Sequence, residues 1–174
     1  MDMETMMKLL MSSDALGQVG KQAGVTEKEA SDAMKIIVPM LLKGMQGQAQ
    51  NVDTQAGFLE ALASHGKDDT KDVSKFLSNV DTEDGGKIVK HLLGAQEEEL
   101  AAKAKKKSGI DTKKIIKIMA IVAPLLMAQM GKQAKAKSGS ASQGSASDVI
   151  GIIGGLMDGI DASDVFKIVG ALMK

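Results

Sequence analysis

Residues 109–135, GIDTKKIIKIMAIVAPLLMAQMGKQAK, contain the most apolar run of the chain, Ile115 to Met130. The run is interrupted by Lys117, Pro124 and Gln129, and it is shorter than the roughly 20 apolar residues that a membrane-spanning helix needs. A helix that is apolar on nearly all sides is typical of the centre of a bundle. Because proline removes a backbone hydrogen bond inside a helix, we expect a kink or a break at Pro124.

The same pattern occurs earlier in the chain, in residues 24–50, GVTEKEASDAMKIIVPMLLKGMQGQAQ. The two stretches align without gaps at an offset of 85, so that Pro39 corresponds to Pro124. The other identical pairs are Gly24/Gly109, Lys28/Lys113, Met34/Met119, Ile36/Ile121, Leu41/Leu126, Met45/Met130, Gln48/Gln133 and Ala49/Ala134. A repeat of this length indicates duplicated supersecondary structure.

A second match, at an offset of 80, joins residues 81–93, DTEDGGKIVKHLL, to residues 161–173, DASDVFKIVGALM. Because both matches keep their order along the chain, we predict a tandem duplication with units 1–94 and 95–174. The predicted fold class is all-α, built as two pseudo-equivalent helical bundles, each with a proline-kinked central apolar helix. Alternation of apolar and polar residues with a period of two is absent, which argues against a sheet.

Helix signals repeat between the units. Thr26 and Asp111 are expected to cap the two central helices, and Glu29 completes a capping box with Thr26. Short helices are predicted at residues 54–64 and 72–78, and Asp81 is expected to cap the next one. In the second unit, residues 138–147, SGSASQGSAS, predict a flexible linker before helices at 148–159 and 161–173.

Composition excludes several classes of protein. The chain has 174 residues and contains no Cys and no Arg. The lack of cysteine rules out disulfides, thiolate catalysis and cysteine-ligated metals. Its 22 Lys balance 22 acidic residues, which argues against nucleic acid as a partner. Divided at the duplication, however, residues 1–94 have a net charge of −4 and residues 95–174 one of +4. Asp2 and Glu4 stand where a secretory signal carries positive charge, so we expect a cytoplasmic protein.

No constellation of titratable residues predicts catalysis or metal binding. His65 and His91 are interpreted as structural, and residues 79–86, NVDTEDGG, lack the glycine that a calcium loop needs at its sixth position. A hydrolase using His91 with Asp81 or Asp84 is a minor hypothesis. We predict no cofactor, no metal and no catalytic residues.

Three features are candidates for interaction. The first is a lysine run that follows a glutamate run on one predicted helix and consists of Lys103, Lys105, Lys106 and Lys107. The second is a glycine strip with a spacing of four, Gly151, Gly155 and Gly159, which permits close approach of a helix from the same bundle or from a second chain. The third is the Met-rich segment 1–11, which is expected to dock on protein rather than on a membrane.

Residues 24–42, 84–94 and 109–127 resemble the YidB-like bacterial family of unknown function. The shared pattern is a central helix with a Pro-Leu-Leu-like sequence and a DGG-x-I-x-x-H-x-x-G helix, here from Asp84 to Gly94. The second unit departs from it, because Val165 and Phe166 replace the glycine pair and Ala171 replaces the histidine. The resemblance implies an all-α bacterial cytoplasmic protein and adds no mechanism.

The duplication, the opposite charges and the lack of a catalytic set predict a non-enzymatic structural or scaffold protein. We expect it to associate with itself head to tail, as a ring or filament. The alternative is a peripheral module that binds an anionic membrane or another polyanionic surface through its Lys-rich second unit.

Overall fold

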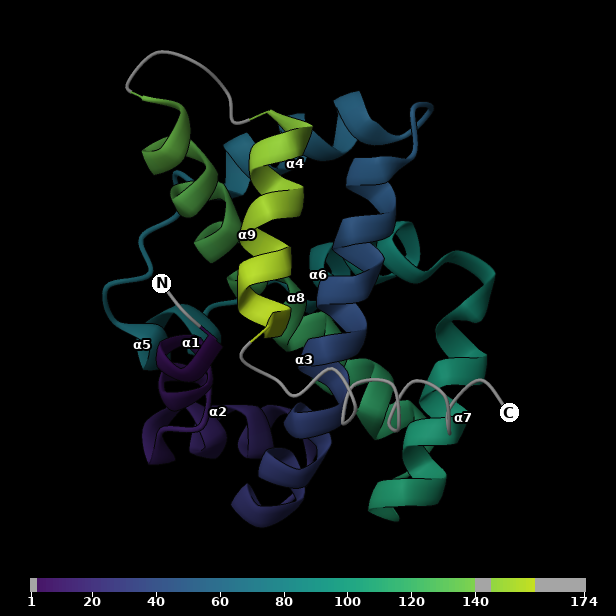
Figure 1. Ribbon diagram of the computed structural model, residues 1–174. Coiled ribbons are helices and arrows are strands. Elements are labelled where there is room, and N and C mark those ends of the chain that lie inside the picture. Colours follow the sequence, from purple (N-terminus) through teal and green to yellow (C-terminus); the bar gives the residue numbers. More distant parts are fainter. Residues whose placement is uncertain (1–2, 140–144, 159–174) are drawn as a thin grey trace.

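The computed structural model describes residues 3–139 and 145–158, and every regular element within them is a helix (Figure 1). The elements are α1 (Met3–Leu10), α2 (Ser13–Ala23), α3 (Glu27–Gln50), α4 (Gln55–His65), α5 (Val73–Ser78), α6 (Thr82–Leu93), the 3-10 turn η1 (Gly94–Gln96), α7 (Glu97–Ser108), α8 (Thr112–Ser138) and α9 (Ala146–Asp158). The predicted all-α class is confirmed. The repeat segment 161–173 lies outside the described residues.

The predicted caps form at the starts of the two central helices. The Thr26 side chain accepts a hydrogen bond from the Glu29 backbone N–H, and the Glu29 carboxylate accepts one from the Thr26 N–H, which completes the capping box. Asp111 caps α8 through the Lys113 backbone N–H. Side-chain caps also begin α2, α5 and α6, at Ser12, Asp72 and Asp81.

Helix α9 begins inside the segment predicted as a linker. The hydroxyl of Ser145 accepts a hydrogen bond from the Asp148 backbone N–H, and the Asp148 carboxylate accepts one from the Ser145 backbone N–H. This reciprocal pair resembles a capping box, with Asp in place of Glu. Hydrogen bonds from Ser145 also lower the pKa of the Asp148 carboxyl. Ser145 therefore marks the start of helix α9, although the Ser/Gly-rich composition around it predicts a linker.

Helix α8 is the core helix of the fold, as its apolar sequence predicts. Its side chains are buried without interruption from Ile118 to Gly131. The helix is long and apolar enough to cross a membrane, but 83% of its most apolar window is buried inside the fold. Helices α2, α4, α6, α7 and α9 all pack against it.

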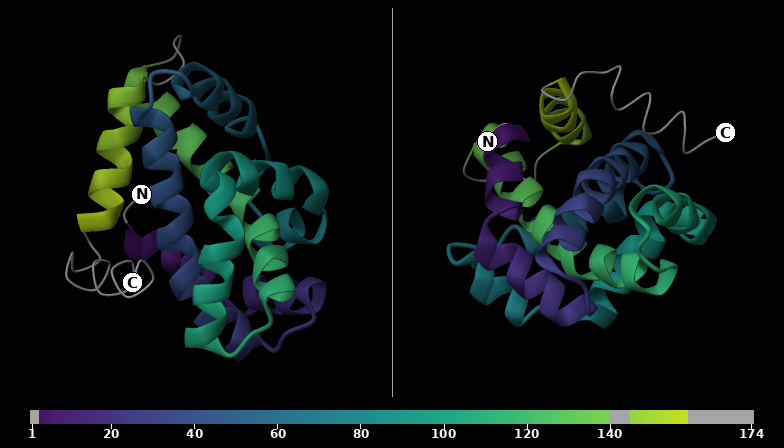
Figure 2. Two further views of the ribbon diagram at one scale, coloured as in Figure 1. Left: turned by 90° about the vertical axis from the view of Figure 1, so that its right-hand side faces the viewer. Right: turned by 90° about the horizontal axis from the view of Figure 1, so that it is seen from below.

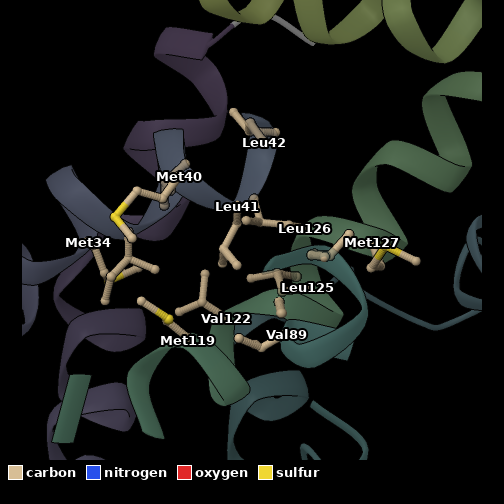
Figure 3. Close-up of a cluster of buried hydrophobic side chains, with 14 of the residues drawn as sticks. Met34, Met40, Leu41, Leu42, Val89, Met119, Val122, Leu125, Leu126 and Met127 are labelled. Carbon is tan, nitrogen blue, oxygen red and sulfur yellow. The ribbon is translucent and has the colours of Figure 1, made fainter. Parts of the chain in front are cut away.

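The buried side chains form one hydrophobic cluster to which both predicted units contribute. Figure 3 shows its centre, where Met34 and Leu41 of α3 face Met119 and Val122 of α8, with Val89 of α6 beside them. Helices from the first unit pack directly on the central helix of the second, and α9 packs on α3 (Figures 1 and 2). The predicted arrangement as two bundles is not confirmed.

Neither central helix breaks at its proline, since α3 runs through Pro39 and α8 through Pro124, and kinks are not confirmed. Pro124 has no N–H to donate to the Ala120 carbonyl one turn earlier. Helix α6 crosses α8 at that carbonyl, because a Cβ added at Gly85 would overlap the Ala120 oxygen. Pro124 and Gly85 therefore both affect the surroundings of the Ala120 carbonyl, at which α6 crosses α8.

The Met-rich N-terminus packs on the protein itself. Met6 and Leu10 of α1 are fully buried, and α1 contacts α2 and α9. The expectation that this segment docks on protein agrees with that burial. Its apolar face is consequently occupied within the fold.

Gly85→Ala tests the crossing of α6 over α8. The added methyl group has no room beside the Ala120 carbonyl, so we expect the free energy of unfolding to fall by about 3 kcal/mol or more. Gly86→Ala is the matched control, because a Cβ there meets no atom within 4 Å, and it should stabilise the helix by about 0.5–1 kcal/mol. Urea denaturation followed by circular dichroism measures both, and equal effects of the two variants would contradict the crossing.

Candidate functional site

An acidic hollow of about 580 Å³ opens beside the middle of α8. The end of α4, the loop to α5, the start of α6 and Pro124 of α8 form its walls. We define the hollow by its five carboxylates, Asp68, Asp69, Asp72, Asp81 and Asp84. Lys75 is the one lysine in its lining, and no lysine among the described residues forms an ion pair with these carboxylates. The hollow therefore carries an excess of negative charge.

Local hydrogen bonds hold several of these carboxylates in place. Asp72 and Asp81 cap the helices that follow them, and Asp69 accepts a hydrogen bond from the Lys71 backbone N–H at 3.1 Å. A carboxylate has room for further donors on its second oxygen. Asp69, Asp72 and Asp81 are therefore positioned by the backbone and still able to accept donors from outside.

His65 stands between two of the aspartates. Its Nδ1 lies 3.1 Å from Oδ2 of Asp68, and its Nε2 lies 3.9 Å from Oδ2 of Asp84. This arrangement was not predicted from the sequence, although Asp68 follows His65 by three residues and is adjacent to Asp69. The contact to Asp84 depends on how α4 and α6 both pack on α8, and it had no sequence signal.

The structure separates His91 from the aspartates with which the hydrolase hypothesis paired it. His91 lies seven residues after Asp84 on α6, which is about 10 Å along the helix axis. It lines a different hollow, of about 370 Å³, with Phe58 and Met127. In the described ranges, 3–139 and 145–158, no group of three His, Asp or Glu side chains is arranged to hold a metal ion. Residues 79–86 form a capped helix start, as expected.

Buried Thr70 fixes the loop that carries Asp68, Asp69 and Asp72. Its hydroxyl accepts hydrogen bonds from the Gln129 side-chain amide, at 3.2 Å, and from the Lys132 ammonium, both of α8. Beside this anchor, α4 approaches α8 so closely that a Cβ at Gly131 would overlap the Leu62 carbonyl. The hollow is thus built on the rigid core helix.

A basic corner lies where α7 turns into α8. We define it by five exposed lysines around Gly109, namely Lys105, Lys106, Lys107, Lys113 and Lys114. Gly109 makes the turn with a φ of 75°. Lys105 Nζ lies 3.4 Å from Asp111 Oδ1, and this hydrogen bond lowers the pKa of the Asp111 carboxyl. One carboxylate does not balance five lysines, so the corner remains strongly positive.

Lys103 does not belong to this corner, although the sequence groups it with the other lysines. Its ammonium lies 2.8 Å from the carboxylate of Glu99, one helical turn earlier, and its side chain is only 20% exposed. It lines an apolar groove between α3 and α7 instead. The lysine run of the sequence therefore separates into Lys103, which is half-buried and paired with Glu99, and three exposed lysines at the end of α7.

The glycine strip of α9 faces away from the rest of the described chain. Gly151 and Gly155 are exposed, and a Cβ at Gly154 or Gly155 would meet no described atom within 4 Å. Close packing of this strip within its own bundle is not seen among residues 3–139 and 145–158. Gly159 lies outside the described residues.

Comparison with known protein families matches residues 5–133 to a family described as bacterial protein of unknown function (DUF937). The match covers most of the chain and both proline helices. The chain belongs to this family. A single match extends across residue 94, which is the predicted boundary between the two units. The family assignment therefore does not show the tandem duplication. No curated protein and no solved structure matches the chain.

Thr70→Val tests the loop anchor. Valine has the shape of threonine without the acceptor, so Gln129 and Lys132 lose their partner, and we expect the free energy of unfolding to fall by about 1–3 kcal/mol. Thr112→Val, at the first residue of α8, removes a hydroxyl for which no such bond to another helix exists, and it is the control. Thermal unfolding compares them. A Thr70 variant as stable as the Thr112 variant would rule out the anchor.

Proposed function

We propose that this protein is a non-enzymatic structural protein that assembles head to tail, with the basic corner of one copy in the acidic hollow of the next. The observation that carries the proposal is charge complementarity. Five carboxylates without a lysine partner surround the hollow, and five lysines project from the corner. Opposite potentials of this kind steer association and fix the register of partners.

The positions of the two surfaces favour assembly that continues. Figure 1 shows α5, which borders the hollow, at the left of the molecule and α7, which ends in the corner, at the right. In a dimer that forms through two different surfaces, one copy keeps an unused hollow and the other keeps an unused corner. Further copies therefore add, and the product is a ring or a filament according to the rotation between neighbours.

The shapes of the two surfaces also favour the proposed contact. The corner is a helix–turn–helix edge with exposed lysines on both sides of Gly109, and the hollow is a depression of about 580 Å³. Backbone hydrogen bonds already hold three of the carboxylates, Asp69, Asp72 and Asp81, so little ordering of these aspartates is needed when lysine side chains reach them. The contact should be weakened by salt, because exposed charges are screened.

We further propose that the fold is a tandem duplication whose halves have exchanged helices. Helix α2 packs on α3 as α7 packs on α8, and a left-handed glycine, Gly24 or Gly109, joins each pair. Helix α4 packs mainly on α8, the central helix of the other half, and α9 packs mainly on α3. This reciprocal pattern is what an internal pseudo-two-fold axis produces, and it supports the repeat found in the sequence.

The absence of enzymatic activity remains part of the proposal. Among the carboxyls whose pKa is lowered, Asp111 is exposed and Asp32 and Asp148 are half-buried, and none of the three lines a hollow described above. Hydrogen bonds from Lys28, Lys105 and Ser145 account for these shifts. Shifted pKa values at active sites usually come from burial or from paired charges within a cleft. A cytoplasmic location is proposed with this role.

Binding of the basic corner to an anionic surface is the second candidate, because all five of its lysines are exposed. Met6 and Leu10 are buried within the fold, so these side chains of the Met-rich segment do not supply an apolar anchor for a membrane. Lysines alone give weak and salt-sensitive attachment to a bilayer. Self-association is therefore the stronger proposal.

Charge reversal on each surface tests head-to-tail assembly. We expect Lys106→Glu/Lys107→Glu and Asp68→Lys/Asp72→Lys each to weaken self-association by about tenfold or more, because like charges then face each other. Lys135→Glu/Lys137→Glu changes the charge of the last turn of α8 by the same amount and should leave association unchanged. Sedimentation velocity at about 0.05 M and about 0.5 M salt measures the assembly.

Mixing the two surface variants gives the decisive outcome. The lysine variant keeps an intact hollow and the aspartate variant keeps an intact corner, so an equimolar mixture should recover the association that each variant alone has lost. A wild-type protein that remains monomeric in low salt at high concentration would refute the proposal. Binding to anionic vesicles that the Lys106→Glu/Lys107→Glu change abolishes, without any self-association, would favour the second candidate.

A further inference from the structure

His65 lies in the wall of the acidic hollow, with its side chain 20% exposed. Both of its ring nitrogens face carboxylates, since Nδ1 lies 3.1 Å from Oδ2 of Asp68 and Nε2 lies 3.9 Å from Oδ2 of Asp84. A neutral imidazole carries a proton on only one of its two nitrogens, whereas an imidazolium carries one on each. The protonated ring therefore attracts both carboxylates, and the neutral ring donates to one of them at most.

The surroundings of His65 are mainly negative on every side that carries charge. Helix α4 packs on α8 and on α3. Helix α8 presents the uncharged Pro124 to the hollow, and its Lys132 donates a hydrogen bond to Thr70. Residues 44–50, GMQGQAQ, at the end of α3 contain no charged side chain, and the exposed Glu60 and Lys67 in the chain around His65 have opposite charges. The charged groups that line the hollow with His65 are Asp68, Asp69, Asp72 and Lys75 before and within α5, and Asp81 and Asp84 at the start of α6.

Among the described residues that line the hollow, His65 is the one whose side-chain type changes charge between about pH 5 and about pH 8. Aspartate and lysine side chains ordinarily keep their charge over this range. The other histidine of the chain, His91, lies in a different hollow with Phe58 and Met127. A change of pH within this range therefore acts on the acidic hollow through His65.

Protonation of His65 opposes the binding of lysine in two ways. It adds a positive charge to the hollow that the lysines of the basic corner enter, and it draws Asp68 and Asp84 into ion pairs within their own chain. Two of the five carboxylates are then less available to a partner. By reciprocal linkage, a lysine bound beside these carboxylates disfavours the protonated ring. Association and protonation of His65 therefore compete.

We propose that His65 regulates head-to-tail assembly, and that its protonation releases the basic corner of one copy from the acidic hollow of the next. This inference rests on the proposed head-to-tail contact and assigns the regulation of that contact to one side chain. Assembly is strongest where the imidazole is neutral, above about pH 7, and weakens as the pH falls towards about 5.5.

Sedimentation velocity at about pH 7.5 and about pH 5.5, in about 0.05 M salt, tests the regulation. We expect the association constant of the wild-type chain to be about tenfold lower at the lower pH, because a charge is added between the two surfaces. His65→Gln keeps a side chain that can hydrogen-bond to Asp68 but takes up no proton, so its association constant should change by less than about twofold. His91→Gln is the matched control, because it removes the same titratable group from the other hollow and should keep the wild-type dependence on pH.

His65→Lys gives an independent comparison, because it places a permanent positive charge in the hollow. At about pH 7.5 it should associate about tenfold more weakly than the wild-type chain, with little further change at about pH 5.5. Circular dichroism at both pH values checks that the variants keep their helix content.

The outcomes separate the regulation from the assembly itself. Wild-type protein that assembles equally at both pH values, or a His65→Gln variant that keeps the full dependence on pH, would overturn the role of His65 and leave head-to-tail assembly in place. A wild-type chain that is monomeric at both pH values would overturn the assembly and its regulation together.

Discussion

Enclosure of one long apolar helix on all sides is the constraint on which the rest of this structure depends. Helix α8 is buried without interruption from Ile118 to Gly131, and covering it from several directions requires backbones to approach closely. Glycines make this possible at two crossings, where Gly85 of α6 meets the Ala120 carbonyl and Gly131 of α8 meets the Leu62 carbonyl of α4. Pro124 leaves the first of these carbonyls without its usual helical donor.

The charged surfaces follow from the way the core helix is covered. The turn into α8 carries the basic corner, and the loop that crosses its middle, anchored by Thr70 to Gln129 and Lys132, carries aspartates of the acidic hollow. Both surfaces are therefore attached to the buried core helix. A rigid separation between two complementary surfaces is what an assembly with a regular repeat requires.

Sequence patterns predicted local structure well where a side chain acts on its own backbone. The caps at Thr26, Asp81 and Asp111 were predicted because a hydroxyl or carboxylate two or three residues before a backbone N–H needs no tertiary contact. The start of α9 at Ser145 was missed, since low-complexity serine composition outweighed the same signal. The His65–Asp84 contact was missed because its two residues belong to different helices.

The sequence by itself determined the all-helical class, the apolar core helix, the family and the opposite charges of the two halves, because these depend on periodicity and composition. Only the tertiary structure decided which helix covers which. It packs α4 and α6 on α8 and α9 on α3, separates Lys103 from the other lysines, and gathers five aspartates into one hollow. Helix pairing depends on the fit of ridges and glycine gaps between distant segments, and spacing along one chain does not record that fit.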